Sequence, residues 1–137
     1  MIVESGAGLP ARFSDDDYKN VGVKVLKTAA NLWQNADIII KVQPPTVKEI
    51  KRFKKGQLLV SFIWPAQNKD MLELLKEKGV TTISMDMVPR ISRAQKMDAL
   101  SSMANIAGYR AVIEATNSFE RFLTGQITAA GKVPPAK

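Results

Sequence analysis

The sequence predicts an α/β fold in which a parallel β-sheet lies between two layers of helices, followed by one long helix. Up to about residue 91, short apolar runs of strand length alternate with amphipathic segments of helical length. Such alternation is typical of β-α-β units, whose parallel strands need helices on both faces. Beyond residue 91 the alternation stops and one helical pattern continues to about residue 123.

Apolar runs and capping residues predict each element of the first region. The expected strands are Ile2–Glu4, Val21–Val25, Asp37–Val42, Leu58–Ile63 and Thr81–Met85. The expected helices are a helix capped by Ser14 and ending at Tyr18, Lys27–Gln34, Val47–Phe53 capped by Thr46, and a helix capped by Asn68 and ending at Lys78. Hydroxyl and amide side chains favour helix starts, and Gly79 follows the last helix as a glycine C-cap would.

Residues 92–123 predict one long helix, because they contain no proline and a single glycine, and apolar residues recur every three or four positions. At 1.5 Å per residue this helix would be roughly 45 Å long. A compact protein of this size is only about 35–40 Å across. The helix should therefore break, for example near Gly108, or extend beyond the sheet. Its stripe of small residues fits packing within the domain or a bridge to a second domain or subunit, and residues 124–137 predict an extended linker.

The composition excludes several function classes. The chain has no Cys and no His, which excludes disulfides, thiolate chemistry, zinc sites of the usual type and Ser-His-Asp triads. No apolar run approaches the roughly 20 residues that span a bilayer, so direct membrane insertion is not expected. The net charge is +7, and six basic residues but one acid lie between Lys41 and Lys55. With one aromatic and no recognition motif there, a solvated helix face is favoured over a nucleic-acid patch.

The segment Pro89–Gly108 carries the strongest candidate site, because polar side chains are dense where a buried helix would be apolar. Gln95, Asp98 and Ser101 are three residues apart and are expected to share one helix face with Asn105. Asp98 could accept hydrogen bonds from the hydroxyls of a ribose, and Arg90 could bind a phosphate or carboxamide. The alternative is a helix face that is paired across an interface.

Three further candidates follow expected strands, where α/β proteins place ligands. They are Ser5–Gly8, Lys41–Gln43 and Trp64–Gln67. The glycines do not form the G-x-G-x-x-G pattern of a dinucleotide-binding turn. Lys41 ends an apolar strand, so its ammonium group either binds an anion or extends to solvent.

Several long strings of residues resemble the NAD(H)-binding component of proton-translocating NAD(P) transhydrogenase, the soluble region of its alpha subunit. The resemblance covers essentially the whole chain, and the matching stretches are residues 3–8, 40–42, 61–67, 88–90, 98–112 and 125–137. It implies two Rossmann-like subdomains flanking a cleft for NAD(H), with the cofactor bound mainly on the second. Arg90, Gln95, Asp98 and Ser101 would contact the nicotinamide and its ribose, and the first three are the candidate catalytic residues for positioning hydride transfer.

The resemblance also implies partners and a location. NADP(H) would bind a separate component, protons would pass through a transmembrane component, and the protein would be a homodimer. This segment would be the soluble part of an enzyme at the cytoplasmic face of the bacterial inner membrane or at a mitochondrial or other organellar membrane.

Relative to that family, a first strand and helix are expected before Met1, and a glycine-rich NAD-binding subdomain after Lys137. The expected organisation is an incomplete domain: residues 1–91 form a Rossmann-like subdomain, residues 92–123 a connecting helix, and residues 124–137 a linker. NADH binding by these 137 residues alone is therefore not expected.

Two other functions stay open. The first is alanine dehydrogenase, which resembles the chain more weakly and uses a lysine and a histidine to bind its oxo-acid and move a proton. Lys41 fits the position of that lysine. Trp64 stands at the position of the histidine, and a tryptophan side chain can act neither as an acid nor as a base. The chain could instead act only as a dimerisation module without catalysis.

Overall fold

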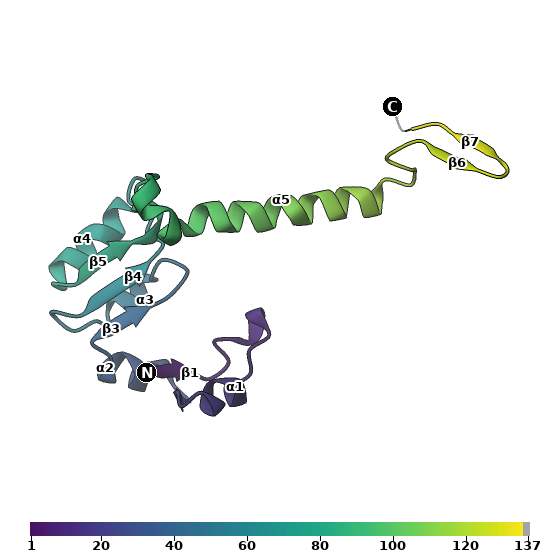
Figure 1. Cartoon of the computed structure of the whole chain (residues 1–137). Coiled ribbons are helices and arrows are strands. Elements are labelled where there is room, and N and C mark those ends of the chain that lie inside the picture. The colour runs from purple at the N-terminus through teal and green to yellow at the C-terminus, as the bar shows by residue number, and fades with distance from the viewer. Residues whose placement is uncertain (136–137) are drawn as a thin grey trace. The chain divides into compact units, whose positions relative to one another are not determined.

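The structure is a computed structural model that describes residues 1–135, and it divides into two units, Met1–Met97 and Asp98–Lys137 (Figure 1). The first unit contains five strands, all parallel to their neighbours: β1 (Ile2–Glu4), β2 (Lys24–Leu26), β3 (Ile38–Ile40), β4 (Leu58–Ser61) and β5 (Thr81–Ser84). Helices flank these strands, so the predicted Rossmann-like α/β class is confirmed.

The strands form two parallel sheets rather than one, in the orders β1-β2 and β3-β4-β5. In the larger sheet Ile39 pairs with Leu59, and Leu59 pairs with Thr82. The second strand begins at Lys24, later than the predicted Val21, because α1 is followed by a turn in which Gly22 has φ 79°. The remaining strands lie within or at their predicted ranges.

The helices of the first unit are α1 (Asp15–Asn20), α2 (Ala29–Asn35), α3 (Val47–Ile50) and α4 (Lys69–Glu77), with short 3₁₀ helices η1 (Leu9–Ala11), η2 (Met85–Met87) and η3 (Ser92–Met97). Ser14 and Thr46 cap α1 and α3, as predicted, and each also forms a capping box, with Asp17 and Glu49 respectively. Gly79 adopts φ 65° after α4, which is the left-handed conformation of a helix C-cap. Asn68 precedes α4 but its side chain does not cap it; the amide donates to the carbonyl of Ile63 instead.

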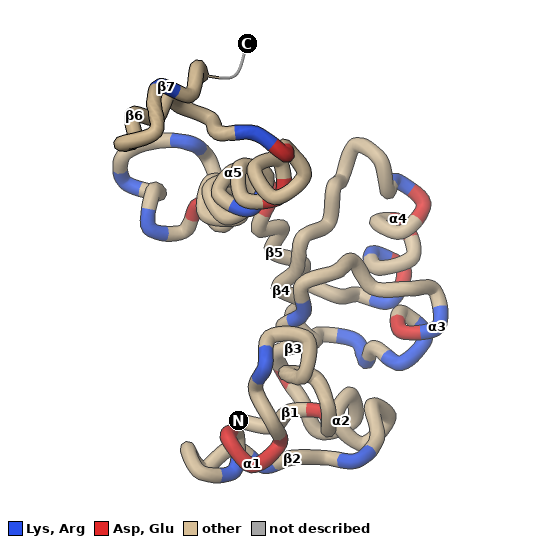
Figure 2. The backbone as a smooth tube through the Cα atoms, turned by 90° about the vertical axis from the view of Figure 1, so that its right-hand side faces the viewer, with Lys and Arg blue, Asp and Glu red and all other residues tan. Residues whose placement is uncertain are grey.

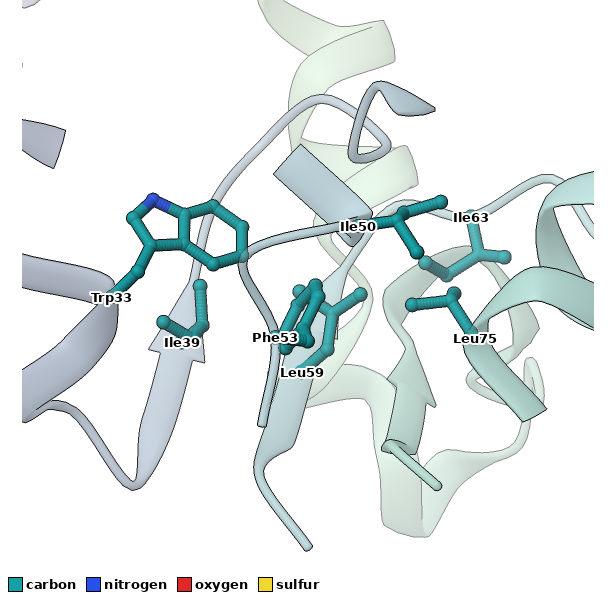
Figure 3. Packing of buried hydrophobic residues seen from close by; sticks show 7 residues of the cluster. All are labelled: Trp33, Ile39, Ile50, Phe53, Leu59, Ile63 and Leu75. Carbon is teal, nitrogen blue, oxygen red and sulfur yellow. The ribbon is translucent and has the colours of Figure 1, made fainter. Parts of the chain in front are cut away.

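The core lies against the larger sheet and is shown in Figure 3. It consists of Trp33, Ile39, Ile50, Phe53, Leu59, Ile63 and Leu75, which come from α2, β3, α3, β4 and α4 and the adjoining segments. Trp33 and Phe53 meet edge to face, with ring centroids 4.7 Å apart. This is a favoured aromatic geometry, so the two rings fix α2 against the segment that follows α3.

One buried polar side chain fastens α2 to the start of β4. Gln57 is 5% exposed, and its amide donates to the carbonyls of Trp33 at 2.9 Å and Ala36 at 2.6 Å. Its side-chain oxygen accepts from the backbone N–H of Lys54 at 2.7 Å. These bonds satisfy the carboxyl end of α2, where carbonyls have no partner within the helix.

The second unit differs most from prediction. Its helix α5 spans Ala99–Ser118, whereas the sequence predicted a helix over residues 92–123. Ser92–Met97 is a 3₁₀ helix, and Asp98 caps the new helix by accepting from the backbone N–H of Ser101. The helix runs through Gly108 without a break.

The predicted extended linker contains an antiparallel hairpin. Strand β6 (Gln126–Thr128) pairs with β7 (Gly131–Val133), and Gly131 has φ 132° at the turn. Residues 136 and 137, the end of that predicted linker, lie outside the described residues. Within residues 1–135, no helix is both long and apolar enough to cross a membrane.

Candidate functional site

The carboxyl ends of β3, β4 and β5 lie at one edge of the larger sheet, because the three strands are parallel neighbours. The loops that leave this edge hold Lys41–Gln43, Trp64–Gln67 and Arg90, so one edge gathers three of the segments that the sequence singled out. Ligands of open parallel sheets bind at this edge.

Ser61 joins the loop after β3 to the end of β4. Its side chain is almost completely buried, and its hydroxyl lies 3.0 Å from the carbonyl of Gln43 and 3.2 Å from those of Val42 and Phe62. The backbone N–H of Phe62 also donates to the carbonyl of Val42. The first two loops are therefore fixed to each other.

Asp86 joins the loop after β4 to the segment after β5. Its carboxylate accepts from the backbone N–H groups of Ile63 at 2.7 Å and Trp64 at 3.1 Å, and from the hydroxyl of Ser84 at 2.8 Å. Desolvation acts to raise the pKa of Asp86, but these hydrogen bonds together outweigh it and hold the pKa below its usual value. Asp86 is therefore a charged anchor at neutral pH, and all three loops are connected.

Lys41 is engaged by a neighbouring acid. Its ammonium group lies 2.7 Å from the carboxylate of Glu49, and both side chains are half-buried. Burial acts to raise the pKa of Glu49, but the bonds from Lys41 and Thr46 lower it overall. The other basic residues between positions 48 and 55 are exposed on and after α3, where Figure 2 shows them in blue. Lys41 thus has an internal partner, which the sequence analysis left open.

Trp64 has an unusual backbone conformation. Its φ is 53°, in the left-handed region that residues other than glycine rarely adopt. Its side chain is 40% exposed, and its ring lies nearly parallel to that of Phe62, at 19° and 6.2 Å between centroids. The turn therefore presents an aromatic side chain at the carboxyl edge of the sheet.

Arg90 and Gln95 belong to the first unit, and both are exposed. Arg90 follows η2 in an irregular segment, and Gln95 lies in η3. Neither side chain makes a hydrogen bond or ion pair within residues 1–135. Their donors are available to a ligand.

Asp98 and Ser101 belong to the second unit and contact each other at the start of α5. The carboxylate of Asp98 accepts from the hydroxyl of Ser101 at 2.6 Å and from its backbone N–H at 3.0 Å. Asp98 is half-buried and Ser101 is exposed. The predicted shared helix face needs correction: Gln95 lies in a 3₁₀ helix and Asp98 precedes α5, so only Ser101 and Asn105 lie on the α-helix.

The loop after β1 folds onto α1. Asp15 accepts from the hydroxyl of Ser5 at 2.6 Å and the backbone N–H of Gly6 at 2.8 Å. The Gly6 bond is the main cause of the lowered pKa of Asp15, and the Ser5 bond adds to it. This loop is closed by its own residues and supplies no open glycine-rich turn.

Sequence reasoning missed Ser61 and Asp86, the two residues that connect the loops. Their positions in the sequence could have indicated them. Both are polar residues at or just beyond the ends of apolar strands, where the backbone of the loops needs hydrogen-bond partners.

The exposed side chains of Arg90 and Gln95 offer hydrogen-bond donors to a polar ligand. A guanidinium and an amide can both bind a carboxamide or a hydroxyl group. No group of three or more metal-ligating acids occurs within residues 1–135. Within the described residues, the glycine-containing loop after β1 does not form an open turn that could cradle a pyrophosphate.

Comparisons with known proteins identify the family of the chain. The family model described as alanine dehydrogenase/PNT, N-terminal domain, matches residues 1–107. The chain is 66% identical to NAD(P) transhydrogenase subunit alpha of Cereibacter sphaeroides over 99% of its own length and 26% of that protein. It is similar to the crystal structure of transhydrogenase from Sinorhizobium meliloti, with a TM-score of 0.90, 43% identity, and coverage of 98% of this chain and 40% of that one.

A more distant likeness links the chain to L-alanine dehydrogenase. The TM-score is 0.62 and the identity 29%, over 68% of this chain and 25% of that one. The chain thus spans between a quarter and two fifths of the length of these proteins.

Proposed function

Because this chain belongs to the alanine dehydrogenase/PNT N-terminal-domain family, we propose that it is part of the NAD(H)-binding component of an NAD(P) transhydrogenase. The whole protein would transfer hydride between NAD(H) and NADP(H), coupled to proton translocation. The residues described above would shape the nicotinamide side of the NAD(H) site. When bound, the cofactor supplies the hydride chemistry, and the protein supplies orientation.

One observation carries the proposal: Ser61 and Asp86 fasten three loops together at the carboxyl edge of the larger sheet. Hydride transfer is sensitive to the position of the nicotinamide ring, so a site for it needs loops that do not move independently. The network of partly buried or charge-assisted hydrogen bonds would supply this rigidity.

Polar side chains that follow β5 in the sequence would bind the cofactor. Arg90 and Gln95 would donate to the carboxamide and ribose of the nicotinamide side. Asp98 would accept from a ribose hydroxyl, with Ser101 contributing its own hydroxyl. The assignments of Arg90, Gln95 and Ser101 are supported by their exposure, and all four by the match of each group to the donors and acceptors of a nicotinamide riboside.

The contacts of Lys41 weigh against an alanine dehydrogenase activity. A lysine that binds an oxo-acid carboxylate needs a free ammonium group, whereas Lys41 is paired with Glu49 at 2.7 Å. Trp64 has no group that could donate or accept the proton of an amino-acid dehydrogenase reaction. No observation of this structure favours that function over transhydrogenation.

The wider assembly belongs to the same proposal. NAD(H) would be held largely by a subdomain beyond these 137 residues, and NADP(H) by a separate component. A transmembrane component would carry protons, and the protein would be a homodimer. This chain would be a soluble part of that membrane enzyme, at the cytoplasmic face of a bacterial inner membrane or at an organellar inner membrane, and inactive as a fragment.

The test uses the full-length subunit with its partner components. Arg90→Ala and Gln95→Ala should each lower the rate of hydride transfer from NADH to an NADP analogue, by roughly ten- to a hundredfold for loss of an oriented hydrogen bond. Arg93→Ala is the matched control, because Arg93 is also exposed and has no partner within the described residues. The proposal fails if the unmodified protein instead oxidises NADH with pyruvate and ammonium, or if all three variants keep full activity.

A further inference from the structure

The turn at Ile63–Trp64 has an energetically unfavourable backbone conformation at Trp64. A non-glycine residue at positive φ is destabilised by roughly 1 kcal/mol or more, and such residues concentrate at functional sites. Trp64 has φ 53°, and Asp86 offsets the cost by accepting from two successive backbone N–H groups. The fold thus maintains a strained turn with a half-buried charge.

The consequence of that turn is the position of one indole ring. Trp64 follows β4 by three residues, at the edge where the loops of β3, β4 and β5 are joined. Phe62 supports one side of the ring in a nearly parallel arrangement, and the indole remains 40% exposed. A large aromatic side chain that is half exposed on a rigid support is suited to binding a flat ligand by contact with its face.

From this arrangement we propose that Trp64 binds the nicotinamide ring of NAD(H) against its indole face, and that Asp86 is the positioning residue that aims the indole. This inference rests on the proposed function and adds two residues that the resemblance does not supply. The indole face carries negative charge density, and the oxidised nicotinamide ring is a cation. Trp64 would therefore favour the oxidised ring over the reduced, neutral one.

Ligands that differ only at the nicotinamide end test the contact in the full-length subunit. Trp64→Ala should raise the dissociation constant of NAD⁺ by about tenfold, as expected for loss of a partly desolvated cation–π contact. It should raise that of NADH by less, and it should leave ADP-ribose, which lacks nicotinamide, unchanged. Trp64→Phe keeps a smaller ring and should give an intermediate loss for NAD⁺. Isothermal calorimetry measures all three ligands.

Asp86→Asn tests the positioning role. It should weaken NAD⁺ binding by a fewfold and leave ADP-ribose unchanged. The double variant Asp86→Asn/Trp64→Ala should lose less NAD⁺ affinity than the two single effects combined predict, because part of the effect of Asp86 is exerted through the position of the Trp64 indole. A purely structural Asp86 would instead weaken both ligands and add its effect to that of Trp64→Ala.

The controls separate the failure of this inference from failure of the proposed function. Val21→Ala removes exposed apolar surface at the residue that follows α1 and should leave every dissociation constant unchanged. If the unmodified protein binds neither NAD⁺ nor ADP-ribose, the proposed function is wrong, and this inference falls with it. If it binds both and Trp64→Ala weakens them equally, or neither, only the contact with nicotinamide is refuted.

Discussion

Replacing Asp86 by asparagine tests the anchor of the carboxyl-edge loops with almost no change in side-chain volume. The carboxylate accepts from Ile63 N–H, Trp64 N–H and the Ser84 hydroxyl. Asparagine has one acceptor oxygen, and its amide N–H₂ would face one of the two backbone donors. Hydrogen bonds to charged groups contribute about 1.5–3 kcal/mol each, so losing one of them should lower the free energy of unfolding by about 2–3 kcal/mol at pH 7.

The effect should depend on pH in a defined direction. Desolvation raises the pKa of Asp86, but the hydrogen bonds outweigh it and the folded-state pKa is lowered. A carboxyl whose pKa is lower in the folded than in the unfolded state stabilises the fold above its unfolded pKa, about 3.9, and loses this contribution as pH falls through the folded-state value. The stability difference between the original protein and Asp86→Asn should therefore be largest near neutral pH and shrink below about pH 4.

Urea unfolding followed by circular dichroism at several pH values measures this difference. Asp70→Asn is the control: Asp70 is exposed in the first turn of α4, and its replacement should cost a few tenths of a kcal/mol through the helix dipole. A difference for Asp86→Asn below about 0.5 kcal/mol, or one of the same size at pH 3 and pH 7, would refute the anchoring role and the assigned charge.

Three further outcomes are expected. Gln57→Leu removes three hydrogen bonds of a buried side chain and should destabilise the first unit by roughly 2–3 kcal/mol in urea unfolding, whereas Gln67→Leu at an exposed position should not. Gly8→Ala should destabilise by about 1–3 kcal/mol, because its Cβ would lie 2.7 Å from the carbonyl oxygen of Phe13. Gly108→Ala meets no atom within 4 Å and should be neutral or stabilising, so equal thermal shifts for the two alanines would contradict the packing around Gly8. The 137-residue chain alone should show no NADH binding by calorimetry, and micromolar binding would contradict the need for a further subdomain.

Local features of the fold were predictable from the sequence because local interactions decide them. Ser14 and Thr46 were expected to cap helices, and each forms the capping box that its spacing with a later acid allows. The run Leu58–Ile63 predicted a buried strand, and β4 occupies Leu58–Ser61. An apolar run is enough to predict that a strand is present. The residue at which the strand ends, Ser61, depends on hydrogen bonds to the loop after β3, which the sequence does not reveal.

The long helix shows where periodicity misleads. Its apolar spacing continues through residues 92–123, but Asp98 accepts from the N–H of Ser101 and so starts a new helix. An Asp three residues before a Ser inside a helical pattern is a recognisable start signal, and the continuous periodicity obscured it. The hairpin of β6 and β7 was missed because Gly and Pro were read as linker residues, although Gly131 permits a tight turn between two short strands.

The candidate site could be predicted only in part, because the sequence shows which polar residues are present, whereas only the structure shows which groups each of them contacts. Lys41 and Asp86 are both charged residues that follow apolar strands, yet each is bound by the protein itself, to Glu49 and to backbone N–H groups. Arg90 and Gln95 have no partner within residues 1–135. Their sequence surroundings do not distinguish these two classes.

The contacts of each polar group at the sheet edge decide which of them can bind a ligand. A ligand that took Asp86 or Ser61 would have to break hydrogen bonds that are mostly partly buried, and a buried group left without a partner costs roughly 1–3 kcal/mol. A ligand that takes Arg90 or Gln95 displaces only water. Groups that hold the loops and groups that bind should therefore respond differently to mutation: changes at Ser61 and Asp86 should alter both stability and affinity, whereas changes at Arg90 and Gln95 should alter affinity with stability unchanged.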